Sequence, residues 1–271
     1  MDPETILVTG ATDGIGKQIA IELARHGAKV LVHGRDKAKG DKVLDEINRD
    51  NCNENLILYL ADFSSFADIK RMAEEIKREQ SELNVLINNA GVFSKERLLT
   101  KDSLEMTFAV NHLAHFLLTM LLLDLLKASA PARVVNVASG AHRNISAVDF
   151  DNLQGEKSYD GFEAYGLSKL GNVLFTNGLS RRLAGSGVTA NSLHPGVINT
   201  RMQRESYNLG GENVEVGAQT SVYLATSPEV EGVTGKYYSR MAEKHTSDLA
   251  QDKALQEKFW KVSEELLAGY L

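Results

Sequence analysis

The sequence predicts a single-domain α/β protein with a doubly wound, mostly parallel sheet of about seven strands and helices on both faces. Short apolar runs alternate along the chain with longer amphipathic segments, which is the pattern of parallel strands joined by helical crossovers. The length of 271 residues suits one α/β domain. The chain has no internal repeat, low-complexity tract or linker rich in Pro, Gly or Ser.

The elements follow in a regular order. The strand-like runs are TILVT, KVLVH, LILYL, NVLINN, ARVVNVA, VTANSLH and GKYY. Helical patterns lie between them or follow them, over 14–26, to about 49, over 65–80, 101–128, 162–184 and 216–226, and in a C-terminal segment containing EKFWKVSEELL. Right-handed crossovers between these strands wind the chain into a Rossmann-type fold.

Charge and hydropathy exclude several kinds of partner. The formal net charge is −6 and no long basic block is present, so we expect no nucleic-acid partner and no anionic membrane surface. The apolar run LAHFLLTMLLLDLL over 113–126 contains His115 and Asp124. It is also shorter than the roughly 20 apolar residues of a membrane span. We therefore expect a buried helix there.

The cysteine content and the N-terminus indicate the compartment. Cys52 is the only cysteine, which excludes an intramolecular disulfide and a multi-cysteine metal site, and we predict no metal site. A single inert thiol suits a reducing compartment. MDPETILVTG enters a strand-like run almost at once, which leaves no room for a targeting segment. We therefore expect a cytoplasmic protein.

A glycine-rich turn, GATDGIG, follows the first predicted strand. Glycine permits positive φ angles and a close approach to a ligand, and the free N–H groups of a helix N-terminus bind phosphate. The spacing is GxxxGxG rather than GxGxxG, but its place on the first strand and helix favours a dinucleotide site over an ordinary turn. The predicted cofactor contacts are Gly10, Thr12, Asp13, Gly14, Ile15 and Gly16.

The end of the second strand, VLVHGRDKAK, predicts the kind of dinucleotide. A cofactor without a 2′-phosphate usually meets an acidic residue there, which binds the ribose hydroxyls. This chain has Gly34 at that position and Arg35 next. Because the planar fork of arginine suits a phosphate ester, NADP(H) is favoured over NAD(H). We assign no role to His33.

Further motifs follow in a set order: NNAG at 88–91, Asn111, Ser139, YGLSK at 165–169 and HPGVINT at 194–200. Together with TGATDGIG they resemble the classical short-chain dehydrogenase/reductase family over nearly the whole chain. FDNL, YDGFEAYGLSKLGNVLFT and EGVTGKYY resemble its retinol-dehydrogenase-like branch. From Ser139 to Tyr165 the interval is 165 − 139 = 26 residues, about twice the usual one, and this longer interval is typical of that branch.

The resemblance implies a role for each matching residue. Tyr165 is the acid in carbonyl reduction and the base in alcohol oxidation, and Lys169 tunes it and holds the nicotinamide ribose. Ser139 donates to the substrate carbonyl, and Asn111 bends its helix and holds a water in a proton relay. The other implied cofactor contacts are an adenine-binding aspartate, a strand-stiffening asparagine and the segment around the nicotinamide: Asp62, Asn89, Pro195, Val197 and Thr200. Asp62 is also a candidate helix N-cap, and we assign no role to His142.

The spacing of Tyr165 and Lys169 makes this chemistry reasonable. A free phenol, with a pKa of about 10, is a poor acid or base at pH 7. At i and i+4, however, the two side chains share one helix face. Charges about 5 Å apart at an effective dielectric near 20 interact by roughly 3 kcal/mol, which corresponds to about two pKa units.

The sequence predicts an NADP(H)-dependent oxidoreductase that interconverts a ketone or aldehyde with an alcohol. A protochlorophyllide-reductase-like enzyme and a non-catalytic NADP(H)-sensing protein are the alternatives. The polar stretch over 201–215 is a candidate substrate loop, with a plain surface connection as the other interpretation. Its polarity favours a soluble, moderately apolar carbonyl compound over a retinoid. The resemblance leaves open a homodimer or homotetramer through the helices over 101–128 and 162–184.

Overall fold

One sheet runs through the molecule, and the structure, a computed structural model, describes residues 4–51, 53, 55–207 and 210–271. The strand order is β3-β2-β1-β4-β5-β6-β7-β8. The strands are β1 (Thr5–Val8), β2 (Lys29–Gly34), β3 (Leu56–Leu60), β4 (Val85–Asn88), β5 (Ala132–Val137), β6 (Val188–His194), β7 (Tyr237–Ser239) and β8 (Ala242–Glu243). The first seven pair in parallel, and β8 is antiparallel to β7.

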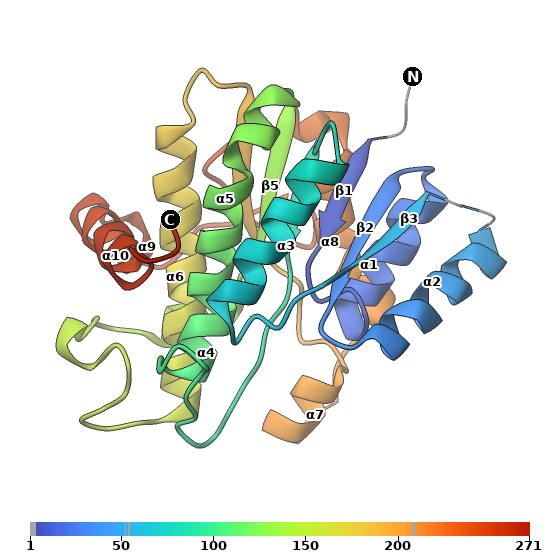
Figure 1. Cartoon of the computed structure of the whole chain (residues 1–271). Helices are drawn as coiled ribbons and strands as arrows, with labels where there is room; N and C mark the ends of the chain where they lie inside the picture. The colour runs from blue at the N-terminus through green and yellow to red at the C-terminus, as the bar shows by residue number, and fades with distance from the viewer. Residues whose placement is uncertain (1–3, 52, 54, 208–209) are drawn as a thin grey trace.

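Helices cover both faces of the sheet (Figure 1). The helices α1 (Gly14–Arg25), α2 (Lys37–Asn51) and α8 (Val214–Thr226) enclose one core with the sheet. On the other face, α3 (Phe66–Glu79), α5 (Ala114–Ala128) and α6 (Gly161–Arg182) enclose a second core. Ile6, Leu7 and Val8 of β1 are all fully buried, because helices cover both faces of a parallel sheet. The predicted doubly wound fold and its seven parallel strands are confirmed.

The helix predicted over 101–128 begins later and is interrupted. It consists of α4 (Met106–Phe108), a π-helical turn (Ala109–Leu113) and α5. Glu105 is the N-cap of α4, because its carboxylate accepts hydrogen bonds from the N–H groups of Thr107 and Phe108. Among the described residues, Met106–Ala128 is the one helical stretch long and apolar enough to cross a membrane, and 72% of its most apolar window is buried within the domain.

The segment over 201–215 is partly helical, which corrects the prediction of a loop. It contains α7 (Arg201–Tyr207) and the first residues of α8. Residues 208–209 of the predicted loop, and Cys52 with its predicted inert thiol, lie outside the described residues. At the lower end of the molecule in Figure 1, α7 lies below the sheet, on the same side as α4.

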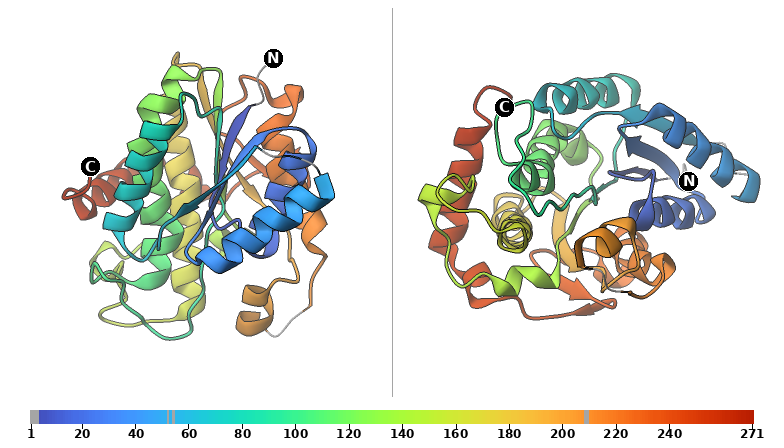
Figure 2. Two further views of the ribbon diagram at one scale, coloured as in Figure 1. Left: turned by 45° about the vertical axis from the view of Figure 1, so that its right-hand side comes forward. Right: turned by 90° about the horizontal axis from the view of Figure 1, so that it is seen from below.

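Two C-terminal helices, α9 (Asp248–Gln251) and α10 (Lys253–Leu266), pack along the outside of α6 (Figure 2). Trp260 contacts Phe116 of α5 and Phe175 of α6, at ring-centroid distances of 4.8 and 5.6 Å. The guanidinium of Arg182 lies 3.9 Å from the centre of the same indole. As a result, α6 is covered by the sheet on one side and by α10 on the other.

Candidate active site

A cleft of about 670 Å³ opens at the carboxyl ends of the central strands. The strand order reverses between β1 and β4, and open α/β sheets bind their ligands at such a point. Thirteen of the sixteen predicted site residues line this cleft: Gly10, Thr12, Asp13, Gly14, Ile15, Gly16, Arg35, Asp62, Asn89, Tyr165, Lys169, Pro195 and Thr200. The three others, Asn111, Ser139 and Val197, lie outside its lining.

The turn between β1 and α1 leaves no room for a side chain at two of its glycines, Gly10 and Gly16. Gly10 has a φ of +65°, and a Cβ atom there would lie 2.8 Å from the Cα of Ala90. A Cβ atom at Gly16 would lie 2.2 Å from the carbonyl oxygen of Gly10. Asp13 caps α1 by accepting from the N–H of Gly14, at 2.8 Å. These glycines bring the N-terminus of α1 to the cleft, so the turn fits a dinucleotide pyrophosphate.

His33, in β2, links the glycine turn to the end of β3 through two hydrogen bonds. Its Nδ1 accepts from the N–H of Gly10 at 3.1 Å, so the hydrogen is on Nε2, which donates to the carbonyl of Ala61 at 3.1 Å. Burial lowers the pKa of His33 to about 4, so it stays neutral in this bridge. No role was predicted for His33, and its adjacency to the glycine turn is visible only in the fold.

Arg35 and Asp62 lie at the end of the cleft formed by β2 and β3. A Cβ atom at Gly34 would lie 2.4 Å from the Cγ2 of Thr12, so the backbone of β2 passes directly over that side chain. Asp62 accepts from both the N–H and the hydroxyl of Ser64. Desolvation opposes ionisation of Asp62, but these bonds together with the charges of Lys101 and Arg35 lower its pKa. Asp62 is not the N-cap of α3, a position that Ser65 occupies.

Two asparagines hold the backbone segments that line the cleft. Asn89 follows β4 and donates from Nδ2 to the carbonyl of Thr9 at 2.8 Å, which ties β4 to β1. Asn111 is fully buried at the centre of the π-helical turn. It accepts from the N–H of Val92 at 2.7 Å and donates to the Val92 carbonyl at 2.9 Å and to Ser168 at 3.1 Å. Such π-helical turns are frequent at functional sites.

Tyr165 and Lys169 project from one face of α6 into the cleft. The Nζ of Lys169 lies 5.6 Å from the centre of the Tyr165 ring, close to the separation expected from their spacing. Lys169 is buried and donates to the carbonyl of Val137, at the end of β5, at 2.9 Å. Burial lowers its pKa to about 8. A cation held so close to a phenol favours the phenolate form.

Ser139 follows β5 and caps the short 3₁₀ helix Gly140–Asn144, accepting from the N–H of Ala141 at 3.2 Å. His142 fixes this turn, because its Nδ1 lies 2.6 Å from the Ser139 carbonyl and therefore donates to it. Its Nε2 then accepts from the N–H of Ser247, before α9, at 3.3 Å. His142 was predicted to be incidental, and the contact with Ser247, 105 residues away, leaves no local signal in the sequence.

The segment after β6 crosses the open side of the cleft. A Cβ atom at Gly14 would lie 3.4 Å from the Cγ2 of Thr200, and one at Gly91 would lie 3.8 Å from the Cε of Met202. The start of α7 is therefore close to both the glycine turn and the segment after β4. Val197 does not line the cleft and is 52% exposed.

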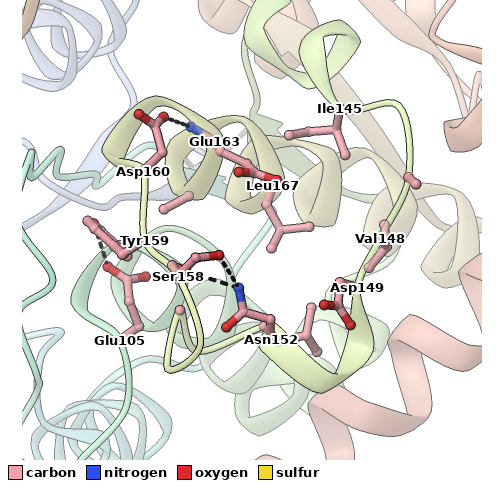
Figure 3. A pocket seen from close by; sticks show the side chains of 14 residues that line it. Glu105, Ile145, Val148, Asp149, Asn152, Ser158, Tyr159, Asp160, Glu163 and Leu167 are labelled. Carbon is pink, nitrogen blue, oxygen red and sulfur yellow. Dashed lines mark hydrogen bonds between the residues drawn. The ribbon is translucent and has the colours of Figure 1, made fainter.

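A second, smaller cavity lies between the start of α6 and the segment before it (Figure 3). Its volume is about 50 Å³, enough for a few water molecules. Tyr159 bonds to Glu105 across one wall, and Asn152 donates to the Ser158 carbonyl at 3.0 Å (Figure 3). The larger cleft is the one with room for a dinucleotide and a substrate.

A parallel sheet with a glycine turn at its switch point defines a dinucleotide-binding α/β protein. A model of the short chain dehydrogenase family matches residues 4–208, and the chain belongs to this family of oxidoreductases. It resembles mouse retinol dehydrogenase 12, at 44% identity over 97% of this chain and 86% of that protein. It also resembles human retinol dehydrogenase 14, at 40% identity over 100% of this chain and 88% of that protein.

Solved structures agree with the fold. A crystal structure of a protein from Mycobacterium paratuberculosis superposes with a TM-score of 0.81 at 30% identity, covering 98% of this chain and 95% of that one. Pseudomonas aeruginosa RhlG, in an active-site complex with NADP, has a TM-score of 0.70 at 27% identity, covering 86% and 93%.

Proposed function

We propose that the protein is an NADP(H)-dependent oxidoreductase that interconverts a ketone or aldehyde with an alcohol. The observation that carries the proposal is the pair Tyr165 and Lys169, which shares one cleft with the glycine turn. A phenol beside a buried cation can deliver or accept a proton next to a dinucleotide. The resemblance to retinol dehydrogenases supports alcohol and carbonyl chemistry.

The residues divide the work of the reaction. The bound cofactor supplies or accepts the hydride. In carbonyl reduction the hydroxyl of Tyr165 gives its proton to the carbonyl oxygen, and in alcohol oxidation the phenolate takes it back. Lys169 supplies the positive charge that stabilises the phenolate. Asn111 holds the Gly91–Val92 segment in place and supports a water leading from Lys169 toward solvent.

Ser139 is the second donor to the substrate oxygen. Its Oγ accepts from the N–H of Ala141, and none of the described residues accepts from its hydroxyl. The hydrogen can therefore turn toward an oxygen that becomes negative during reduction, as in an oxyanion hole.

The preference for NADP(H) rests on the end of β2. Arg35 lines the cleft next to Gly34. An acidic side chain at Gly34, suited to NAD(H), would place its Cβ 2.4 Å from Thr12. The chain thus supplies a guanidinium suited to a phosphate, and a competing carboxylate at Gly34 would require the Thr12 side chain to shift.

A panel of carbonyl compounds assayed with NADPH and NADH side by side tests this function. We expect turnover with NADPH, and we expect Arg35→Ala to reduce the preference for NADPH over NADH by about tenfold, the effect of one lost charge-assisted hydrogen bond. Lys37→Ala, which removes an exposed pair with Asp41 on α2, is the control. A preference for NADH in the wild type would contradict the assignment of Arg35.

We also propose a single cytoplasmic domain with α7 as its substrate segment. Met202 of α7 and Thr200 just before it line the cleft, which supports the role of α7. The burial of Met106–Ala128 inside the fold supports a core helix there rather than a membrane span. Because α10 packs against α6, a homodimer or homotetramer through the face of α6 that α10 covers would require α10 to move.

A further inference from the structure

Three aromatic rings form a row that ends at Tyr165. Phe93 follows β4, and its ring centre lies 5.1 Å from that of Phe162 and 5.9 Å from that of Tyr165. Phe162, in the first turn of α6, is 46% exposed, whereas Phe93 lines the cleft and is partly buried. The row therefore leads from the surface to the ring that carries the proposed acid.

The backbone under this row is firmly held. A Cβ atom at Gly161 would lie 2.3 Å from the carbonyl oxygen of Ser94, so α6 starts directly against the segment that carries Phe93. The hydroxyl of Tyr159 lies 3.2 Å from that same carbonyl oxygen. Asp160 caps α6 by accepting from the N–H groups of Phe162 and Glu163, both at 2.9 Å. The backbone that carries the first two rings is thus held in place by contacts within the protein.

Part of the cleft lining is apolar and polarisable, although Ser94, Lys95 and Glu96, which follow Phe93, also line the cleft. Val92, Met106, Val110 and Met202 line the same cleft. Thioethers make favourable contacts with aromatic rings, often at the ring edge. A flat ring placed against Phe93 would therefore meet a second π-system, in a cleft that also presents methionine thioethers.

We propose that Phe93 determines substrate specificity by seating carbonyl compounds whose carbonyl carbon is bonded directly to an aromatic ring. This inference rests on the proposed function and identifies its substrate class as aryl ketones and aryl aldehydes. Aromatic pairs prefer offset or edge-to-face geometry with centroids 4.5–7 Å apart, so a substrate ring on Phe93 holds its attached carbonyl beside Tyr165. In reduction the carbonyl carbon gains the hydride, the oxygen gains the Tyr165 proton, and the cofactor is oxidised.

The test compares two ketones of the same size and connectivity, acetophenone and cyclohexyl methyl ketone, with NADPH. The readout is the ratio of their kcat/KM values within each protein, relative to the wild type, which cancels their different intrinsic reactivity. In Phe93→Leu we expect the aryl-to-cyclohexyl ratio to fall three- to tenfold, the range of an aromatic pair. Phe162→Leu should lower it less, since Phe162 is one ring further out.

Phe150→Leu is the matched control, because Phe150 undergoes the same chemical change but lies outside the cleft, near Phe259. Its ratio should equal that of the wild type. An unchanged ratio in Phe93→Leu, or an equal fall in Phe150→Leu, overturns the proposal.

Binding of the same two ketones to the protein with NADP⁺, measured by calorimetry, separates this inference from the proposed function. We expect acetophenone to bind more weakly to Phe93→Leu by the same factor, with the cyclohexyl ketone unaffected. Such selective binding without turnover would reject the proposed reaction but would support Phe93 as the binding site for the aryl ring. If neither ketone binds the wild type, the proposed binding of an aryl ring against Phe93 is wrong.

Discussion

The two halves of the cleft are built in different ways. In the half at β1 and β2, the backbone packs at close range: Gly10 lies against Ala90, Gly16 against Gly10, and β2 against the side chain of Thr12. In the half at α6, side chains from distant segments meet, as Phe93 and Phe162 do. In the first half an added Cβ atom at Gly10 or Gly16 would collide with backbone, whereas in the second half the contacts are between side chains. The cofactor half is therefore the rigid part of the site, and the substrate half is the part in which specificity can vary.

The largest expected effect lies in the substrate half. Tyr165→Phe removes the proton donor and keeps the ring that contacts Phe93. We expect kcat to fall by about 10²–10⁴-fold, the usual contribution of general acid–base catalysis, while the Kd for NADPH stays within about twofold. Steady-state kinetics and fluorescence titration measure the two quantities. Full turnover in this variant would refute the mechanism.

The rigid half is tested by adding one carbon atom. Gly16→Ala places a methyl group 2.2 Å from the Gly10 carbonyl and 2.4 Å from the Nδ2 of Asn89. Overpacking of this kind costs about 1–3 kcal/mol, and we expect the Kd for NADPH to rise by at least about tenfold. Gly269→Ala, where no atom lies within 4 Å, is the control. Equal NADPH affinity in both variants would show that the backbone around Gly16 can move to accept a methyl group, which would contradict a rigid turn.

The pH dependence of kcat reports on the charge of Lys169, which lies between the two halves of the cleft. Because burial lowers its pKa to about 8, the ammonium is present below pH 8 and is lost as the pH rises through that value. We expect kcat for carbonyl reduction to be level below pH 8 and to fall about tenfold per pH unit above it. Lys169→Arg keeps its charge, so its decline should begin at higher pH. An unchanged profile in that variant would assign the titration to another group.

The same pKa sets the sign of an effect on stability. Lys169 loses its proton more readily in the folded protein than in the unfolded chain, where its pKa is 10.5. The cost of the buried charge is therefore fully present below pH 8 and disappears above pH 10.5. Below pH 8 the difference in unfolding free energy between Lys169→Met and the wild type should favour the variant, and this advantage should shrink as the pH rises to 10.5.

The smallest expected effect concerns His142, which supports Ser139 from behind. His142→Leu removes the donor to the Ser139 carbonyl, and we expect kcat to fall about tenfold, as for one lost buried hydrogen bond. In His142→Asn the amide nitrogen can replace Nδ1, so kcat should stay within about threefold of the wild type. NADPH affinity should not change in either variant. Equal losses in both would mean that His142 serves packing alone.

Local signals explain which predictions were confirmed. The strands and most helices follow from hydrophobic periodicity, and the glycine turn follows from residues only six positions apart. Tyr165 and Lys169 could be paired because helical geometry relates positions i and i+4. The late start of the 101–128 helix was missed because Glu105 stops it through a cap rather than through a change in hydropathy. The helix α7 was missed because its polar sequence has no apolar stripe.

The sequence by itself determined the doubly wound fold, the place of the dinucleotide turn and the pairing of phenol and ammonium, since each depends on neighbours within a few residues. Only the tertiary structure decided that His33 bridges the glycine turn, that His142 joins the Ser139 turn to Ser247, and that Phe93 meets Phe162. These contacts join residues separated by 23 to 105 positions. Chain folding brings them together through long-range packing, which no local pattern of residues records.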